Sequence, residues 1–269
     1  MESYFFVPGL KLHKIADVLA MGANHIIIDL EDAVKESDRV GILQSLSETD
    51  YSQYHIRIPL YDEMGEVDAT FLAQLCERGY RRFVFPKIAS ADDFETLFWT
   101  APEDIEVILL VESPRLLLES FALVTKHSNI ITGIGSGSHD FMSEVGGKHT
   151  LENLEYLRHH LLYVARAANI TAIDIASMEL RDEAIFSHEL SDGFDKGYDA
   201  KFLIHPWQFS IFNKMQFYSR EDYDWAKRVQ AELENSGSSG EFNPVVVNGQ
   251  VIERPHLNRM RKILKHYKI

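Results

Sequence analysis

Residues 21–34, MGANHIIIDLEDAV, contain the unit that recurs along this chain and decides its fold. Gly22 stands where a preceding helix would end, as a C-cap glycine does. A short apolar run, residues 25–29, follows it, and acidic residues come directly after that run. A strand that is apolar on both faces is typical of a parallel sheet covered by helices. We therefore expect residues 25–29 to form one strand of such a sheet.

The same unit recurs through the first 218 residues, with amphipathic segments at helical spacing between the apolar runs. The expected strands are residues 4–7, 25–29, 54–58, 82–86, 107–112, 130–134, 170–176 and 201–204. Eight alternating units in about 215 residues favour an α/β fold of the (β/α)8 TIM barrel type. A doubly wound parallel sheet remains the alternative, because periodicity does not show whether a sheet closes.

The pattern changes after residue 218. Residues 221–234 have the spacing of a charged amphipathic helix, residues 236–240 (SGSSG) are typical of a flexible link, and residues 256–268 predict a basic helix. Asn248-Gly249 between two β-rich triplets predicts a type I′ hairpin. We expect residues 1–218 to form the barrel and residues 219–269 a C-terminal helix–hairpin–helix extension of a single domain. The extension looks too short for its own core, so we expect it to pack on the barrel or on a neighbouring subunit.

Composition excludes several classes of protein. The chain has 269 residues, of which 45% are hydrophobic, and 27 basic against 41 acidic residues give a formal net charge of −14. These values exclude wholesale disorder and argue against nucleic-acid binding, but they suit a carboxylate-bound cation. The one cysteine, Cys76, forms no internal disulfide and falls on an apolar helix face, so we expect a packed thiol.

The N-terminus carries no targeting or membrane signal that we recognise. Its apolar run before Pro8 has only about five residues, too few for a signal peptide or a membrane span. We therefore expect a cytoplasmic protein that does not bind membranes.

Ionisable side chains follow nearly every expected strand. The active site of a TIM barrel lies at the C-terminal ends of its strands, so these groups would meet at one rim. They are Asp29, Glu31, Asp32, Arg57, Lys87, Glu112, Asp140, Asp174 and His205. Two of them have a structural alternative: Asp174 either braces the site or is paired in the core, and His205 serves equally well as a hydrogen-bonding group.

Glu112 and Asp140 are the best candidates for metal ligands, because each follows an apolar strand closely. Mg²⁺ prefers oxygen ligands and is commonly held by one or two carboxylates together with substrate and water. Glu31 and Asp32 would then hold bound waters or orient the ligands. Arg57 and Lys87 supply positive charge for a substrate carboxylate or a developing enolate oxygen.

Several motifs resemble those of the citrate lyase β-subunit family, within the wider group of HpcH/HpaI aldolases. They occur in the family's order: FFVPG (5–9), MGANHIIIDLEDAV (21–34), IRI (56–58), FPKI (85–88), VESPR (111–115), GSHDFMSEVG (137–146), GYDAKFLIHPWQ (197–208) and VNGQVIERPHL (247–257). The resemblance implies a Mg²⁺-dependent TIM barrel that cleaves or forms a carbon–carbon bond. Its implied substrate is a 3-hydroxy acid thioester such as citryl-, malyl- or citramalyl-CoA.

The resemblance also implies roles for residues. Glu112 and Asp140 match the metal ligands, Arg57 matches the substrate-binding arginine, and Glu31 and Asp32 match the acidic pair near the metal waters.

Further implied contributions come from other segments. Glu253 in the tail, often supplied by another subunit in related lyases, would exchange a proton with the enolate carbon. We expect Lys87, Gly137 and Ser138 to contact the substrate beside Arg57. The resemblance implies a homo-oligomer, expected to be a homotrimer, with the tail at its interface.

Four positions depart from the family pattern. Glu2 stands where an arginine is common and would remove a contact with CoA, Pro59 replaces an asparagine, Glu253 an aspartate and Leu116 a glycine. These changes keep two alternatives open: a metal-dependent aldolase acting on free 2-keto acids, and a catalytically silent relative with a binding role. A third, nucleotide binding at GIGSGS (133–138), fits the dinucleotide pattern poorly, and the glycines are better explained by a tight turn beside the metal.

Overall fold

The computed structural model describes all residues except 33, 35, 49, 103, 236–243 and 268–269. The chain divides into two compact units, Met1–Lys214 and Met215–Ile269, close to the expected boundary at residue 218. No helix in the described ranges is long and apolar enough to span a membrane.

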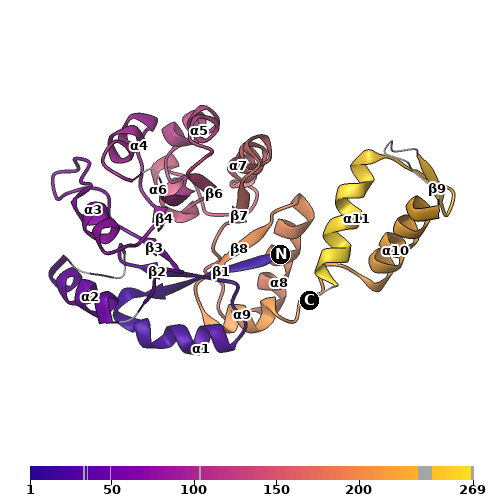
Figure 1. Cartoon of the computed structure of the whole chain (residues 1–269), viewed down its shortest axis with the longest axis horizontal. Helices are drawn as coiled ribbons and strands as arrows, with labels where there is room; N and C mark the ends of the chain where they lie inside the picture. Colours follow the sequence, from indigo (N-terminus) through magenta and orange to yellow (C-terminus); the bar gives the residue numbers. More distant parts are fainter. Residues whose placement is uncertain (33, 35, 49, 103, 236–243, 268–269) are drawn as a thin grey trace. The chain divides into compact units, whose positions relative to one another are not determined.

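Eight parallel strands close into a barrel in the first unit, where β1 pairs with β2 on one side and β8 on the other (Figure 1). The strands are β1 (Glu2–Pro8), β2 (His25–Asp29), β3 (His55–Arg57), β4 (Arg82–Phe85), β5 (Glu106–Leu110), β6 (Ile131–Gly135), β7 (Thr171–Asp174) and β8 (Ala200–Leu203). The closed sheet confirms the TIM barrel and excludes the doubly wound alternative.

Helices follow the strands and surround the barrel (Figure 1). They are η1 (Gly9–Lys14), α1 (Ile15–Ala20), α2 (Glu36–Glu48), α3 (Thr70–Glu77), α4 (Ala91–Phe98), α5 (Pro114–Lys126), α6 (Ser138–Val145), α7 (Glu155–Ala168), α8 (Glu183–Lys196) and α9 (Pro206–Phe212). Ser90 and Ser113 begin α4 and α5 as side-chain N-caps. Cys76 is buried on α3 as expected.

The apolar interior of the barrel positions the site above it. Ile27, Val84, Ile108 and Ile173 pack together there, and Phe202 lies at the top of the cluster. Full burial of each such side chain contributes roughly 1.5–3 kcal/mol.

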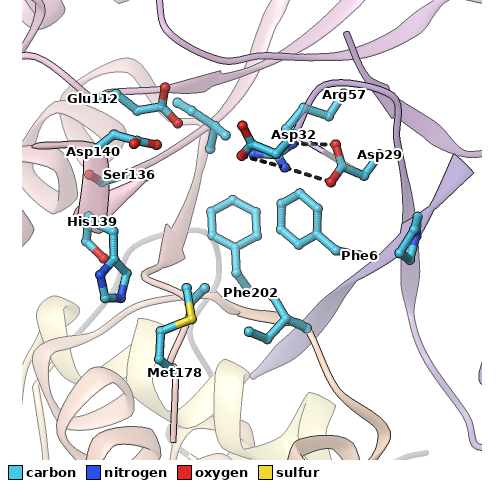
Figure 2. A pocket seen from close by; sticks show the side chains of 16 residues that line it. Phe6, Asp29, Asp32, Arg57, Glu112, Ser136, His139, Asp140, Met178 and Phe202 are labelled. Atoms are coloured by element: carbon cyan, nitrogen blue, oxygen red, sulfur yellow. Dashed lines mark hydrogen bonds and ion pairs between the residues drawn. The ribbon is translucent and has the colours of Figure 1, made fainter. Parts of the chain in front are cut away.

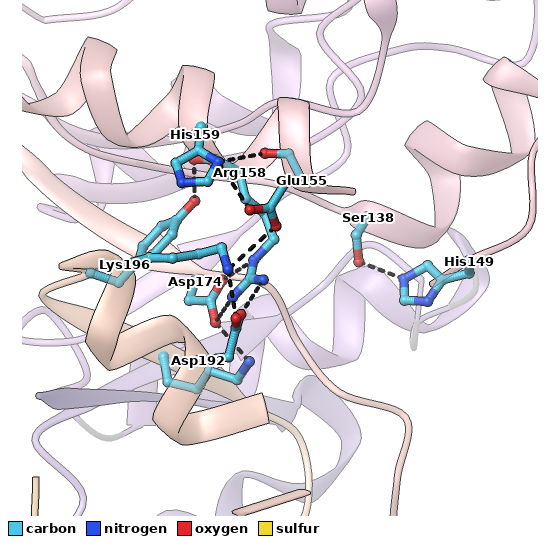
Figure 3. A network of polar contacts seen from close by, with 10 residues as sticks. Ser138, His149, Glu155, Arg158, His159, Asp174, Asp192 and Lys196 are labelled. Atoms are coloured by element: carbon cyan, nitrogen blue, oxygen red, sulfur yellow. Dashed lines mark hydrogen bonds and ion pairs between the residues drawn. The ribbon is translucent and has the colours of Figure 1, made fainter. Parts of the chain in front are cut away.

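Asp174 lies in a buried ion network between the barrel wall and the outer helices (Figure 3). Its carboxylate accepts hydrogen bonds from Arg158 Nε at 2.9 Å and Lys201 Nζ at 2.9 Å, and all three side chains are fully buried. Although burial opposes ionisation, these two cations hold the pKa of Asp174 below its usual value. The structure thus decides for the paired alternative and removes Asp174 from the rim.

The second unit is the helix–hairpin–helix that the tail predicts. It contains α10 (Arg220–Asn235), β9 (Val245–Val247), β10 (Gln250–Ile252) and α11 (Arg254–His266). Asn248 and Gly249 both have positive φ, 50° and 78°, as a type I′ turn requires. The predicted link at residues 236–240 lies outside the described residues.

The tail has a core of its own, contrary to expectation. Its buried members are Ala226, Val229, Val247, Ile252, Met260 and Ile263. Both helices and the hairpin contribute, so apolar residues between positions 226 and 263 gather into one cluster that no single segment could form.

Candidate active site

A pocket of about 250 Å³ opens at the C-terminal ends of the barrel strands, where a TIM barrel places its active site (Figure 2). Its charged lining consists of Asp29, Asp32, Arg57, Glu112 and Asp140. Its apolar lining consists of Phe6, Pro8, Leu110, Ala176, Met178, Phe202 and Ile204. The pocket therefore brings together most of the residues predicted for the rim.

Glu112 is the buried carboxylate of this pocket, with only 4% of its surface exposed. Its Oε2 accepts a hydrogen bond of 2.6 Å from the backbone N–H of Lys87. Burial raises the pKa of Glu112 to about 8, since the N–H of Lys87 only partly offsets the loss of water and Asp140 adds negative charge.

Gly137 makes room for Glu112. A Cβ on Gly137 would lie 2.1 Å from Glu112 Oε1, which no side chain permits. The neighbouring strands β5 and β6 thus bring a buried carboxylate against a bare backbone. Gly137 then begins α6, whose first turn carries Asp140 into the pocket lining. A carboxylate is favoured there by the partial positive charge of a helix N-terminus.

Arg57 lies among three carboxylates. Its guanidinium donates to both oxygens of Asp29 at 2.8 and 2.7 Å and forms ion pairs of 3.2 Å with Glu31 and Asp32. It also lies over the ring of Phe6, 5.2 Å from the centroid. Its charge is therefore already compensated, and its predicted role in binding substrate stays a prediction.

Asp29 is the partner of Arg57 that the sequence analysis did not identify. Asp29 and Arg57 are register partners at the ends of neighbouring strands β2 and β3. Opposite charges at the ends of consecutive apolar runs were the available signal, because consecutive strands of a barrel are adjacent.

Lys87 connects Glu112 with the acidic pair. Its ammonium group forms ion pairs with Glu31 and, at 2.9 Å, with Asp32, while its backbone N–H holds Glu112. Its φ of 55° is left-handed, a conformation that costs a side-chain-bearing residue about 1–2 kcal/mol. In this strained backbone conformation the N–H of Lys87 points toward Glu112.

The two acidic side chains beside Lys87 differ in burial and in the direction of their pKa shifts. Burial raises the pKa of Glu31, and its Oε2 accepts no hydrogen bond even though Arg57 is 3.2 Å away. Asp32 is half-exposed, and Lys87 and Arg57 lower its pKa despite partial burial.

Ser138 lies in the pocket lining with a partner of its own. Its buried hydroxyl is 2.9 Å from Nε2 of His149, whose ring stacks on His139 at a centroid distance of 3.7 Å (Figure 3). No sequence pattern indicated His149, which stands in a loop eleven positions away.

Three of the predicted positions lie elsewhere. Glu2 starts β1 at the opposite end of the barrel, paired with His25 at 3.0 Å, so it removes no positive charge from the pocket, and its expected effect on CoA binding stays a prediction. His205 caps α9 by accepting a hydrogen bond from the backbone of Trp207, the structural alternative. Glu253 begins α11 in the second unit, exposed, with its backbone N–H on His256.

The glycines of GIGSGS do not form a phosphate-binding turn. Gly133 and Gly135 lie inside β6, and Gly137 lies against Glu112. These glycines allow close packing next to the pocket, and this role argues against the nucleotide-binding alternative.

The donor set fits Mg²⁺. Glu112 and Asp140 offer carboxylate oxygens at one end of the pocket, and a buried Glu112 needs a positive charge that the compensated Arg57 does not supply. No group of three or more His, Cys, Asp and Glu is arranged for a metal within the described residues. Mg²⁺ needs only one or two protein carboxylates, because water and substrate complete its shell.

Comparison with known proteins assigns the chain to a family. A (3S)-malyl-CoA thioesterase of Cereibacter sphaeroides is 29% identical, covering 98% of this chain and 93% of that protein. Protein CitE of Mycobacterium tuberculosis shares the fold, with a TM-score of 0.78, 23% identity and coverage of 100% of this chain and 98% of that one.

A citrate lyase beta subunit of M. tuberculosis, solved with oxaloacetate and magnesium, is 25% identical with a TM-score of 0.67 over 79% of this chain and 95% of that one. The family model for HpcH/HpaI aldolase/citrate lyase matches residues 2–206, the whole barrel but for its last helix. The chain therefore belongs to the HpcH/HpaI aldolase/citrate lyase family.

Proposed function

We propose that this chain is a Mg²⁺-dependent carbon–carbon lyase that cleaves, or forms by condensation, a 3-hydroxy acid thioester. The observation that carries the proposal is the pairing of buried Glu112 with Asp140 in a pocket whose arginine is already neutralised. Family membership supports it, as do the malyl-CoA thioesterase and the magnesium-bound citrate lyase subunit among the similar proteins.

Glu112 and Asp140 would hold the cation. Bound Mg²⁺ supplies Lewis-acid chemistry, which stabilises negative charge on substrate oxygens. Lys87 would keep the Glu112 carboxylate in place through its backbone N–H. The left-handed backbone and Gly137 together would fix that carboxylate before substrate arrives.

Asp32 and Glu253 would move protons. Cleavage takes a proton from the 3-hydroxyl group, breaks the bond between C2 and C3, and leaves a 2-oxo acid and a thioester enolate. The half-exposed carboxylate of Asp32 would accept that proton, and Glu31, paired with Arg57 and Lys87, would orient bound water. Arg57 would stabilise the enolate oxygen, and Glu253 would protonate the enolate carbon.

We also propose a homotrimer in the cytoplasm, with a small acyl thioester or keto acid as its partner. Glu253 stands on a unit with its own core, which suits delivery of this side chain to a neighbouring copy. Sedimentation as a monodisperse monomer would refute the assembly.

The test is turnover of citryl-, malyl- and citramalyl-CoA with Mg²⁺ and with EDTA, for the parent and for Glu112→Ala and Asp140→Ala. We expect activity that requires Mg²⁺ and falls by at least about 100-fold in both variants. Glu106→Ala, which removes a half-exposed carboxylate from the other end of β5, is the matched control.

Two outcomes would replace the proposal. Cleavage or condensation of free 2-oxo acids with no thioester turnover would establish the aldolase, which the same carboxylates and the size of the pocket also suit. Binding of Mg²⁺ and ligand without any turnover would establish the silent relative.

A further inference from the structure

The pocket has two chemically distinct halves. Glu112 and Asp140 line one side, and Figure 2 shows Phe6 and Phe202 side by side between the carboxylates and Met178. The two rings are 5.4 Å apart and belong to the layer that closes the top of the barrel core. A substrate whose oxygens lie at the acidic end therefore has its remaining substituent against an apolar surface.

Phe202 projects from β8 into the barrel interior, where it meets Gly135 of β6, two strands away in the barrel wall. Gly135 lies under its ring, and a Cβ there would be 2.5 Å from Cε2. Phe202 itself is only 2% exposed. The ring thus occupies space that the absence of a side chain at Gly135 provides.

Charge on the pocket wall points the same way. Among the lining residues in the described part of the chain, Arg57 carries the one full positive charge. Asp29 binds it with two hydrogen bonds, and Glu31 and Asp32 pair with it as well. A second carboxylate on the substrate would meet an acidic wall and aromatic rings, and burying an unpaired carboxylate is strongly unfavourable.

We propose, on the basis of the lyase function above, that the hydroxyl-bearing carbon of the substrate carries an alkyl group rather than a carboxymethyl group, and that Phe202 determines this specificity. The product is then an alkyl 2-oxo acid.

The test compares two ligands of the same shape. Oxaloacetate and 4-methyl-2-oxopentanoate differ only in that a carboxylate of the first is an isopropyl group in the second. Their affinities for the full chain with Mg²⁺ are measured by calorimetry, with pyruvate as a reference. We expect the branched alkyl acid to bind at least about tenfold more tightly than oxaloacetate.

Two variants locate the determinant. Phe202→Leu is expected to reduce the affinity ratio of the alkyl acid to oxaloacetate by at least about fivefold. Phe5→Leu is the matched control, because Phe5 is the same residue type, is buried on β1 and packs on Phe209 away from the pocket. Met178→Arg adds a cation at an exposed pocket position and should raise oxaloacetate affinity about fivefold, with salt reversing the gain.

The outcomes separate this inference from the function it rests on. Oxaloacetate binding as tightly as the alkyl acid, or an unchanged ratio in Phe202→Leu, overturns the specificity alone. The same follows if Phe5→Leu changes the ratio as much as Phe202→Leu. Failure of every 2-oxo acid to bind in the presence of Mg²⁺ overturns the lyase function, and the inference with it.

Discussion

Replacing Glu112 by glutamine should stabilise the metal-free barrel at alkaline pH. The glutamine oxygen can still accept the N–H of Lys87, so the substitution removes the charge and little else. The pKa of Glu112 is raised from 4.5 to about 8, so the folded state binds more protons than the unfolded state between these values. The stability of the parent therefore falls as pH rises from about 4.5 to about 8, and the variant lacks this loss.

The size of the effect follows from the shift. At 1.36 kcal/mol per unit it corresponds to roughly 5 kcal/mol above pH 8. Glu112 borders an open pocket, and water that enters on ionisation recovers part of this, which leaves about 2 kcal/mol. At 2–4 °C per kcal/mol, Tm of Glu112→Gln should exceed that of the parent by roughly 4–8 °C at pH 8.5, and by little at pH 5.

With Mg²⁺ bound, the parent should become more stable than Glu112→Gln. Metal bound to the folded parent raises its Tm in proportion to the logarithm of metal concentration, and the variant should lack most of this response. The assay is thermal unfolding followed by circular dichroism at pH 5, 7 and 8.5, with EDTA or with Mg²⁺. Glu106→Gln, at the exposed start of β5, is the control and should change Tm little. A metal-free Glu112→Gln that is less stable than the parent at pH 8.5, or that responds fully to Mg²⁺, would refute the reasoning.

Three more predictions test separate parts of the structure. Gly137→Ala should abolish the Mg²⁺-dependent rise in Tm while circular dichroism shows a folded barrel, because the new Cβ displaces the carboxylate of Glu112; an unchanged rise would contradict this. Asp174→Asn should cost about 3–5 kcal/mol in urea unfolding, since it takes the buried carboxylate away from both Lys201 and Arg158, and a loss below about 1 kcal/mol would argue against the network. Lys87→Gly should be about 1 kcal/mol more stable than Lys87→Ala, because both lose the ammonium group but only glycine adopts a φ of 55° without strain; equal stability would count against strain.

The positions of strands could be predicted because a strand that is buried on both faces has a continuous run of apolar residues in the sequence. Each short apolar run, such as residues 25–29, forms a strand. The observed ends of the strands lie within two residues of the expected ends. The strand expected at residues 107–112 extends further than the observed one. β5 ends at Leu110, and Val111 adds only one more backbone hydrogen bond to β6. That excess matters, because it leaves Glu112 just beyond the strand, free to face the pocket.

The candidate site could be predicted as a set of charges but not as a set of pairs. Glu112 and Asp140 do line one pocket, as strand ends suggested. The sequence could not show that Asp174 turns outward to Arg158, since a strand residue may face either side of the wall. Nor could it show that Phe6 and Phe202, which fall inside expected strands, form a wall of the pocket.

The sequence by itself therefore determined the order of strands and helices, the end of the barrel at which charges gather, and the type I′ turn of the tail. These features follow from local periodicity and from the backbone preferences of single residues. Only the tertiary structure decided which charges neutralise one another and which remain available. Pairing depends on side-chain direction and on distances between residues that are far apart in sequence. Packing depends on the same distances: the absence of a side chain at Gly137 leaves room for Glu112, and its absence at Gly135 leaves room for Phe202.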